Sequence, residues 1–415
     1  MRLPRIRAIR LVGALYAGLV IGYLGLLLML FLRGETWQAD FTNYYTGAVL
    51  VRDGYGPSLY DPGLQARYQQ EILGGRHLAD GLLPYNHPPH LAILLSPLAR
   101  LPLEQAYAVW TALNVVLWMG FLWDVSRFAR QWGRTTRWLA VGMVAALPGV
   151  FLSLALGATT ILSTVSVWGF YRALKARREV YAGLWLTLGS IRPQIILFPL
   201  LMLVGGRYWR ALYTAILCGV LLILLCSFIL GWGVWPGFVE MIRQTAEAYR
   251  DRYMVAPGEM VNLKALLTLL FGEAHFRTIN LITWMGFLFA ALLVLGVWFF
   301  FLWQPEKPGW ELGVSLTLSL ALFFNPHAHH QDGLTIAVPG LLLYTYLRSV
   351  GLPARVFAIA AGVFPVLWLL DAFFWTPNPV PLFGTLALVV WSIGLLWHSR
   401  VRVRPELIAK CNSSK

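Results

Sequence analysis

The chain alternates long apolar runs with short polar or basic stretches. A helix needs about 20 apolar residues to cross a bilayer, and most runs approach that length. They lack the strict alternation of barrel strands. We therefore predict an all-α polytopic membrane protein with about ten transmembrane helices plus re-entrant and interfacial helices. The expected crossings are Ile9–Leu32, Leu103–Trp123, Trp138–Leu156, Thr159–Ala173, Tyr208–Gly231, Trp284–Trp303, Leu312–Phe324, Gly333–Leu347, Val356–Trp375 and Leu382–Trp397.

Two neighbouring apolar runs are each about half a span long at 1.5 Å per residue, and basic residues flank the pair. We expect Tyr181–Ile191 and Ile195–Val204 to form a hairpin whose tip, at Arg192 and Gln194, lies within the bilayer. An arginine at that depth is a functional hypothesis. The alternatives are an arginine that reaches the headgroups and a single tilted span. The hairpin contains no acidic residue, so we expect a lipid phosphate as the partner of Arg192. An ion pair with a protein carboxylate such as Asp332 would instead indicate a structural role.

The composition agrees with a membrane protein. The 415 residues are 58% hydrophobic and 13% charged, with a mean hydropathy of +0.64. The net charge of +14 comes largely from basic clusters at alternate ends of the apolar runs. That distribution is the positive-inside pattern, so it predicts a multi-pass protein with both termini cytoplasmic and needs no nucleic-acid partner. Three cysteines are too few for a disulfide framework.

We expect one transmembrane catalytic domain over residues 1–400, followed by a basic cytoplasmic tail, 401–415. Two longer polar regions, 33–101 and 232–273, form outer loops. The first should contain short helices at Thr42–Arg52, Gly63–Leu73 and Pro89–Leu101. The second should contain an interfacial amphipathic helix at Phe238–Tyr253.

Three polar features stand out against this apolar background. Asp40 and the stretch from Asn325 to Asp332 fall at outward helix ends, so we expect them to converge at the outer leaflet, with Arg192 deeper. A carboxylate can accept the proton of an acceptor hydroxyl, and a fixed cation can stabilise a departing phosphate. The histidines could ligate a metal, but His329 and His330 cannot share a helical face. They could also be plain interfacial loop residues. We predict no metal site and no cofactor.

The stretch that begins at Asp40 reads DFTNYYTGAVLVRDGYGPSLYDP. It resembles the DF-x-x-YY-x-A…G…LYDP pattern of glycosyltransferase family 87, integral membrane enzymes of the GT-C fold. Tyr85-Asn-His-Pro-Pro is similar to its Y-x-PP stretch, Arg192-Pro-Gln to its K-P-Q element and Asn325-Pro-His-Ala…Asp332 to its S-P-H-x…D element. The matches are in order and span about residues 38–335.

The resemblance implies that a sugar, a hexose such as mannose, passes from a polyprenyl-phosphate-sugar donor to a glycolipid or envelope-glycan acceptor. The reaction would occur on the outer face of a bacterial plasma membrane. Asp40 then matches the catalytic base, and Arg192 with Gln194 matches the donor phosphate site. The expected substrate-pocket residues are Tyr44, Tyr45, Tyr85, His87, His327, His330 and Asp332.

Two departures from the family pattern are visible. Gly157-Ala158-Thr159 stands where the family often has Gly-Gln-x-Asn, and Arg192 replaces a lysine, so a planar fork replaces a point charge. Either change could alter donor preference or abolish activity. Two other functions remain open: a transporter or flippase of lipid-linked saccharides, and a membrane scaffold without catalysis.

Overall fold

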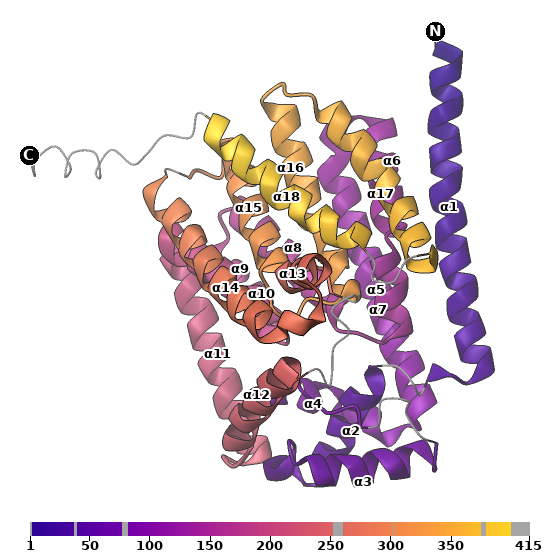
Figure 1. The fold of residues 1–415 in the computed structure, drawn as a ribbon, viewed down its shortest axis with the longest axis vertical. Coiled ribbons are helices and arrows are strands. Elements are labelled where there is room, and N and C mark those ends of the chain that lie inside the picture. Colours follow the sequence, from indigo (N-terminus) through magenta and orange to yellow (C-terminus); the bar gives the residue numbers. More distant parts are fainter. Residues whose placement is uncertain are drawn as a thin grey trace, which may run out of the picture. The chain divides into compact units, whose positions relative to one another are not determined.

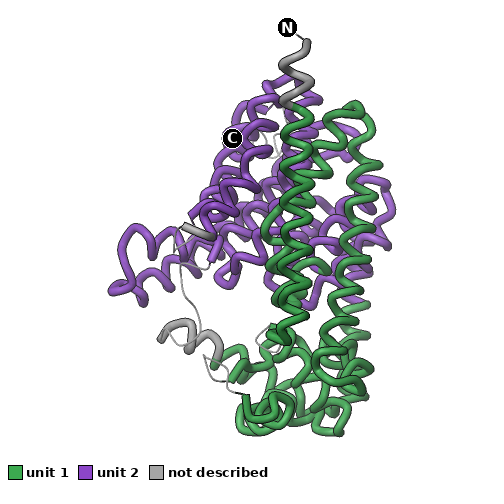
Figure 2. Tube along the Cα trace, turned by 90° about the vertical axis from the view of Figure 1, so that its right-hand side faces the viewer, with its two compact units in different colours: residues 1–162, 218–255 green, residues 163–217, 256–415 purple. Residues whose placement is uncertain are grey.

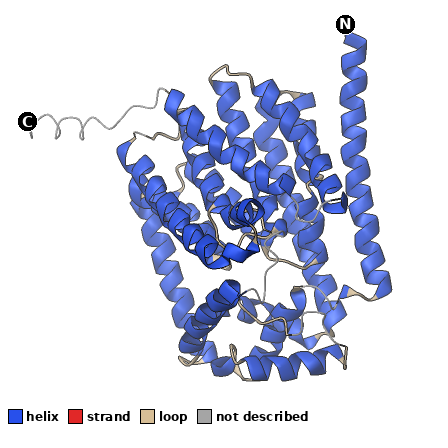
Figure 3. Cartoon of the chain, in the orientation of Figure 1, coloured by secondary structure: helices blue, strands red, loops and turns tan. Residues whose placement is uncertain are grey.

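The computed structural model describes residues 2–36, 40–76, 82–251, 260–301, 303–374 and 379–399. Within these ranges the chain consists of helices and connecting turns, without a strand (Figure 3). An isolated bridge joins Met260 to His329. The predicted all-α polytopic class is confirmed. The predicted tail, 401–415, lies outside the described residues.

The chain divides into two compact units (Figure 2). Unit 1 comprises residues 1–162 and 218–255, and unit 2 comprises residues 163–217 and 256–415. Two helices, α8 (Thr160–Lys175) and α11 (Trp209–Leu230), contribute residues to both. The prediction of a single catalytic domain stays a prediction.

Unit 1 combines long helices with several short ones (Figure 1). Its long helices are α1 (Arg2–Arg33) and α5 (Leu103–Phe128), and α6 (Arg134–Ala145) continues into α7 (Pro148–Ala155) after a break at Pro148. The shorter helices are α2 (Phe41–Arg52), α3 (Pro62–Leu73), α4 (Pro89–Leu95) and the 3-10 turns η2 (Gly56–Ser58), η3 (Ser96–Arg100) and η4 (Ala129–Trp132). The amphipathic α12 (Val234–Asp251) also belongs to this unit.

Unit 2 contains most of the later helices. They are α9 (Glu179–Gly189), α10 (Pro193–Gly206), α13 (Leu263–Phe271), α14 (Phe276–Phe300), α15 (Gly309–Phe323), α16 (Ala337–Ser349), α17 (Ala354–Phe374) and α18 (Pro379–His398), with the 3-10 turns η6 (Glu273–His275) and η7 (His330–Ile336). Every residue of α15 from Trp310 to Phe323 is buried. A helix that is apolar on all sides belongs in an interior, so α15 forms the centre of this unit.

Seven helical segments in the described residues are long and apolar enough to cross a membrane. They are Ile9–Arg33, Leu103–Trp132, Arg134–Ala155, Trp209–Leu230, Glu273–Phe300, Ala354–Ala372 and Pro379–His398. Three further expected crossings fall on shorter helices: α8 has 16 residues, α15 has 15 and α16 has 13. These are below the ~20 residues of a straight span.

Polar residues and glycines fix the ends of the short helices. The Asp61 carboxylate accepts a hydrogen bond of 2.9 Å from the Leu64 N–H at the start of α3, and Pro62 follows it at the first helical position. Gly74 ends this helix in the left-handed conformation, at φ 58°. Asn262 caps α13 in the same way, accepting a bond of 3.0 Å from Ala265 N–H.

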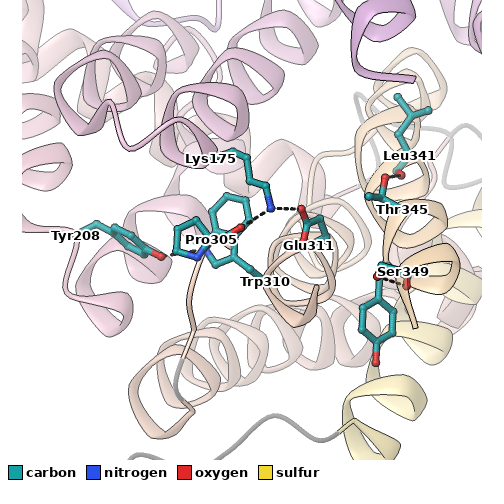
Figure 4. Close-up of polar contacts among 9 residues, drawn as sticks. Lys175, Tyr208, Pro305, Trp310, Glu311, Leu341, Thr345 and Ser349 are labelled. Carbon is teal, nitrogen blue, oxygen red and sulfur yellow. Dashed lines mark hydrogen bonds and ion pairs between the residues drawn. The ribbon is translucent and has the colours of Figure 1, made fainter. Parts of the chain in front are cut away.

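A polar cluster marks one end of unit 2 (Figure 4). Lys175, at the end of α8, forms an ion pair with the buried Glu311 at the start of α15. The neighbouring Trp310 donates a hydrogen bond of 2.9 Å to the hydroxyl of Tyr208, which follows α10. Lys175, shortly before α9, and Tyr208, shortly after α10, therefore lie near the same end of unit 2.

The helices α9 and α10 leave this end and return to it. At the opposite turn of the pair, residues 190–192 separate the helices, and Pro193 begins α10. Gly183 of α9 packs against α11: an added Cβ would lie 2.6 Å from the carbonyl oxygen of Ala211. Gly205 of α10 similarly touches the backbone of α14 at Leu295. This path agrees with the hairpin expected for residues 181–204.

Candidate functional site

Asp40 directly precedes the buried helix α2 in unit 1. The Phe41 N–H donates a hydrogen bond of 3.0 Å to the carbonyl of Leu156, and the Phe41 ring packs edge-on against Tyr107. These contacts hold the start of α2 against the turn that follows α7. Asp40 itself is half-buried. The amide dipoles at a helix N-terminus favour a negative charge, so this position suits an ionised carboxylate.

The turn beside Asp40 requires the glycine at 157. Gly157 has a φ of +64°, and a Cβ there would lie 2.7 Å from the Cβ of Phe41. Its carbonyl accepts a bond of 2.7 Å from the indole N–H of Trp110. Ala158 and Thr159 are fully buried. Gly157, which the family pattern shares, therefore permits close packing against α2.

The aromatic residues predicted for the pocket gather around α2 and α4. The ring of His87 stands edge-on to Tyr44 at 4.7 Å between centroids. The Tyr45 hydroxyl donates to the carbonyl of Leu101 at 2.6 Å. The Tyr85 hydroxyl donates to Pro88 at 2.8 Å and accepts from Ala92 at 3.0 Å. Tyr45 and Tyr85 thus bond the scaffold, and a substrate role for any of the four stays a prediction.

In unit 2, Arg192 and Asp332 form a buried ion pair. Their side chains are 8% and 0% exposed. The second carboxylate oxygen of Asp332 accepts a bond of 3.1 Å from the His329 N–H. Arg192 precedes α10, where Gln194 lies half-buried in the first turn. The expectation that Arg192 takes its counter-ion from a lipid is therefore corrected: a protein carboxylate compensates its charge, because the fold brings Asp332 to the hairpin tip.

The segment 260–265 is tied to the loop 325–332. Val261 N–H donates to the carbonyl of Ala328 at 3.0 Å, beside the Met260–His329 bridge. The Asn262 side-chain amide donates to the carbonyl of Asn325 at 2.8 Å. The Thr385 hydroxyl of α18 donates a hydrogen bond of 3.0 Å to the carbonyl of Val261. The loop 325–332 is therefore held by the segment 260–265, and α18 holds that segment in turn.

Three histidines occupy this loop. His327, His329 and His330 all keep part of their surface accessible. The protein atoms packed around His327 lower its pKa, and the neighbouring His329 and Lys264 lower it further. The same packing lowers the pKa of His329, although Asp332 acts in the opposite direction. Both imidazoles are thus neutral near pH 7 and suit hydrogen bonding to a neutral group better than charge neutralisation.

Lys264 is a buried cation that the sequence analysis did not single out. It lies in the first turn of α13, 1% exposed, with its ammonium 4.5 Å from the ring centroid of Phe276. Burial lowers its pKa to about 8. The available signal was a lysine at the start of the apolar run Leu263–Phe271, directly after the capping residue Asn262. The sequence analysis assigned no helix to that run.

No group of three His, Cys, Asp or Glu side chains in the described ranges is arranged to hold a metal ion. Among the polar side chains described in the two units are acids, imidazoles and cations. The described residues offer a half-buried carboxylate at Asp40 in unit 1, and cations and imidazoles around Arg192, Lys264 and the loop 325–332 in unit 2.

Comparison with known protein families shows to which family the chain belongs. The model of glycosyltransferase family 87 matches residues 85–326, more than half of the chain. Asp40, Tyr44 and Tyr45 precede the match, and His327, His330 and Asp332 follow it. No curated protein and no solved structure matches the chain. Because the match includes the Tyr85 stretch, the Arg192 hairpin and the start of the late loop, and because the chain carries long apolar helices, this protein belongs to glycosyltransferase family 87 and is a membrane glycosyltransferase.

Proposed function

We propose that the protein transfers a hexose from a polyprenyl-phosphate donor to a hydroxyl of a glycolipid or envelope-glycan acceptor. The supporting observation is the position of Asp40 at the N-terminal end of α2. The turn that packs beside it, at Gly157, has room only for a glycine. In the reaction, the acceptor oxygen bonds to the anomeric carbon while the bond from that carbon to the phosphate oxygen breaks. Asp40 accepts the hydroxyl proton, and polyprenyl phosphate leaves.

In unit 2, the proposed donor site is organised by the ion pair of Arg192 and Asp332. Arg192 fixes Asp332, and Asp332 in turn fixes the backbone of His329. His327, His330 and Gln194 are proposed to hydrogen-bond the donor. Tyr44 and His87 are the aromatic residues proposed to contact substrate in unit 1. The membrane is proposed to be a bacterial plasma membrane, with both termini cytoplasmic, since the basic clusters follow the positive-inside pattern.

The test of this function is transfer by the purified protein in nanodiscs. A panel of polyprenyl-phosphate hexoses, with mannose first, is offered together with glycolipid acceptors. Asp40→Asn removes one charge and should lower kcat by roughly 10²–10⁴-fold, the usual contribution of a general base. The thermal stability of this variant should remain close to that of the wild type, because asparagine has nearly the same size and is equally favoured before the first turn of a helix.

A matched control lies at the other end of the same helix. Asp53 follows α2 and forms a partly exposed pair with Arg52. Asp53→Asn should leave kcat within a few-fold of wild type, because exposed pairs contribute little. Wild-type turnover by Asp40→Asn would remove the base assignment. Absence of transfer from every polyprenyl-phosphate sugar would remove the proposed donor class.

A further inference from the structure

Two basic side chains are buried in the described part of unit 2: Arg192 and Lys264. Arg192 is committed to Asp332. Lys264 belongs to the segment 260–265, which is hydrogen-bonded to the loop 325–332, and its charge lowers the pKa of both His327 and His329. Lys264 therefore contributes a positive potential at this loop.

The local setting of Lys264 favours an anion. It occupies the first turn of α13, where backbone N–H groups lack intrahelical acceptors and the helix dipole is positive. The ammonium also faces the ring of Phe276 at 4.5 Å. An ammonium buried in this way interacts with an incoming anion more strongly than an exposed one would, because little water screens the pair.

Asn325 supplies an independent observation. It is fully buried, and its side-chain oxygen accepts a bond of 2.9 Å from His327 N–H, which fixes the orientation of the amide. Its backbone carbonyl accepts from Asn262. The Asn325 side-chain nitrogen has no hydrogen-bond partner in the described structure. A buried amide nitrogen without an acceptor is costly, so this group calls for an oxygen that a ligand would bring.

We propose that Lys264 and the side-chain amide of Asn325 bind the phosphate of the sugar donor, with Arg192 acting as a positioning residue for the loop. This proposal rests on the proposed function and refines its donor site. Lys264 provides the charge and Asn325 provides a directed donor, a combination that suits phosphate oxygens. Asn262 connects the two, since it caps the helix that carries Lys264 and bonds the carbonyl of Asn325.

The first experiment measures binding apart from turnover. Farnesyl phosphate, a short isoprenoid phosphate, is titrated into the full-length protein in phosphatidylcholine nanodiscs. Lys264→Met preserves length while removing the charge, and should weaken affinity by roughly ten- to a hundredfold, as expected for a charge-assisted contact. Asn325→Asp keeps the acceptor for His327 N–H but replaces the donor with an anion, and should weaken affinity at least as much. Lys264→Arg should retain most of it.

The control is Lys307→Met, an exposed lysine of the same unit, which should bind as the wild type does. Each variant is first required to show a wild-type melting transition. If Asn325→Asp fails this requirement, the Lys264→Met and Lys264→Arg pair decides alone. Wild-type affinity in Lys264→Met would overturn the proposal.

A pH series separates binding from a merely structural role. The Lys264 ammonium, with its pKa of about 8, loses its charge as the pH rises from 7 to 9. Over this range His327 and His329 stay neutral, because their pKa values lie below the ordinary value. Wild-type affinity should therefore fall toward pH 9, whereas Lys264→Arg should keep it, since a guanidinium stays charged. Parallel pH profiles in the two proteins would overturn the assignment.

Two sources of phosphate are distinguished by competition. Adding phosphatidylglycerol to the nanodiscs should leave farnesyl phosphate affinity unchanged if the site takes the donor. Displacement by phosphatidylglycerol would make it a lipid headgroup site and overturn the donor assignment. Transfer assays distinguish the two proposals. If Lys264→Met still transfers the sugar in an Asp40-dependent way and the KM for the donor is unchanged, only the phosphate site is rejected. If the wild-type protein shows no transfer but binds farnesyl phosphate in a way that depends on Lys264, only the proposed reaction is rejected.

Discussion

Arg192 and Asp332 are 140 positions apart in the sequence and meet in a buried ion pair. One comes from the turn between α9 and α10, and the other from η7, which follows the central helix α15. Asp332 also accepts the His329 N–H, so the pair joins the hairpin tip to the late loop. Removing either partner leaves a buried charge uncompensated, and this is costlier than removing both.

The ion pair predicts a non-additive response to mutation. Arg192→Met should lower the free energy of unfolding by about 3–5 kcal/mol, the usual effect of stranding a buried charge. Asp332→Asn keeps an acceptor for His329 N–H but strands Arg192, so it should be destabilising as well. The double variant should recover much of the loss. Thermal denaturation in detergent measures all three, and additive losses would contradict coupling between the residues.

The hairpin predicts which positions share a membrane face. Cysteines replacing Arg178 and Arg210, both exposed and flanking α9 and α10, should react with an impermeant maleimide from the same side. A cysteine at Lys307 should react from that side too, because the adjacent Glu306 forms an ion pair with Arg177.

His275 provides the opposite control for this labelling. It lies at the start of the apolar segment Glu273–Phe300, and Lys307 follows the other end of that segment. A cysteine at His275 should therefore react only from the other side. Labelling of positions 178 and 210 from different sides would exclude the hairpin.

Helix packing predicts unequal effects for two glycine substitutions. Gly183→Ala places a methyl 2.6 Å from a backbone oxygen of α11, so the helices must separate, at a cost of about 1–3 kcal/mol. Gly340→Ala, in α16, meets nothing within 4 Å and should be neutral or stabilising by about 0.5–1 kcal/mol. Melting temperatures of the two variants provide the measurement. Equal shifts would mean that α9 does not pack closely on α11.

Much of the secondary structure follows from the sequence. The short helix expected at Thr42–Arg52 is α2, one residue longer, and the one expected at Gly63–Leu73 is α3. The stretch Pro89–Leu101 forms α4 followed by η3. These elements are predictable because proline at the first turn, capping aspartate and terminal glycine act within a few residues. The break between α6 and α7 at Pro148 has the same local origin, although the sequence analysis expected one uninterrupted crossing there.

The residues of the candidate site can be predicted from the sequence only in part. The polar positions Asp40, Arg192 and Asp332 stand out in the sequence because charge is rare in apolar surroundings. Their partners do not. The hairpin sequence contains no acidic residue, whereas the fold supplies Asp332 from a distant loop. Lys264 falls in the region 232–273, for which the sequence predicts an outer loop, and only the packing of α13 against α14 and the loop 325–332 makes it a buried cation.

The sequence by itself therefore determined the all-α membrane class, most helix positions and the family, because hydropathy, capping and short motifs are properties of neighbouring residues. The tertiary structure alone decided which charge compensates which, that α15 is enclosed on all sides, and that Asn262, which caps the helix carrying Lys264, bonds Asn325. Those outcomes depend on contacts between residues far apart in the chain. Burial and electrostatic pairing are properties of the assembled interior, and the linear order of residues does not specify them.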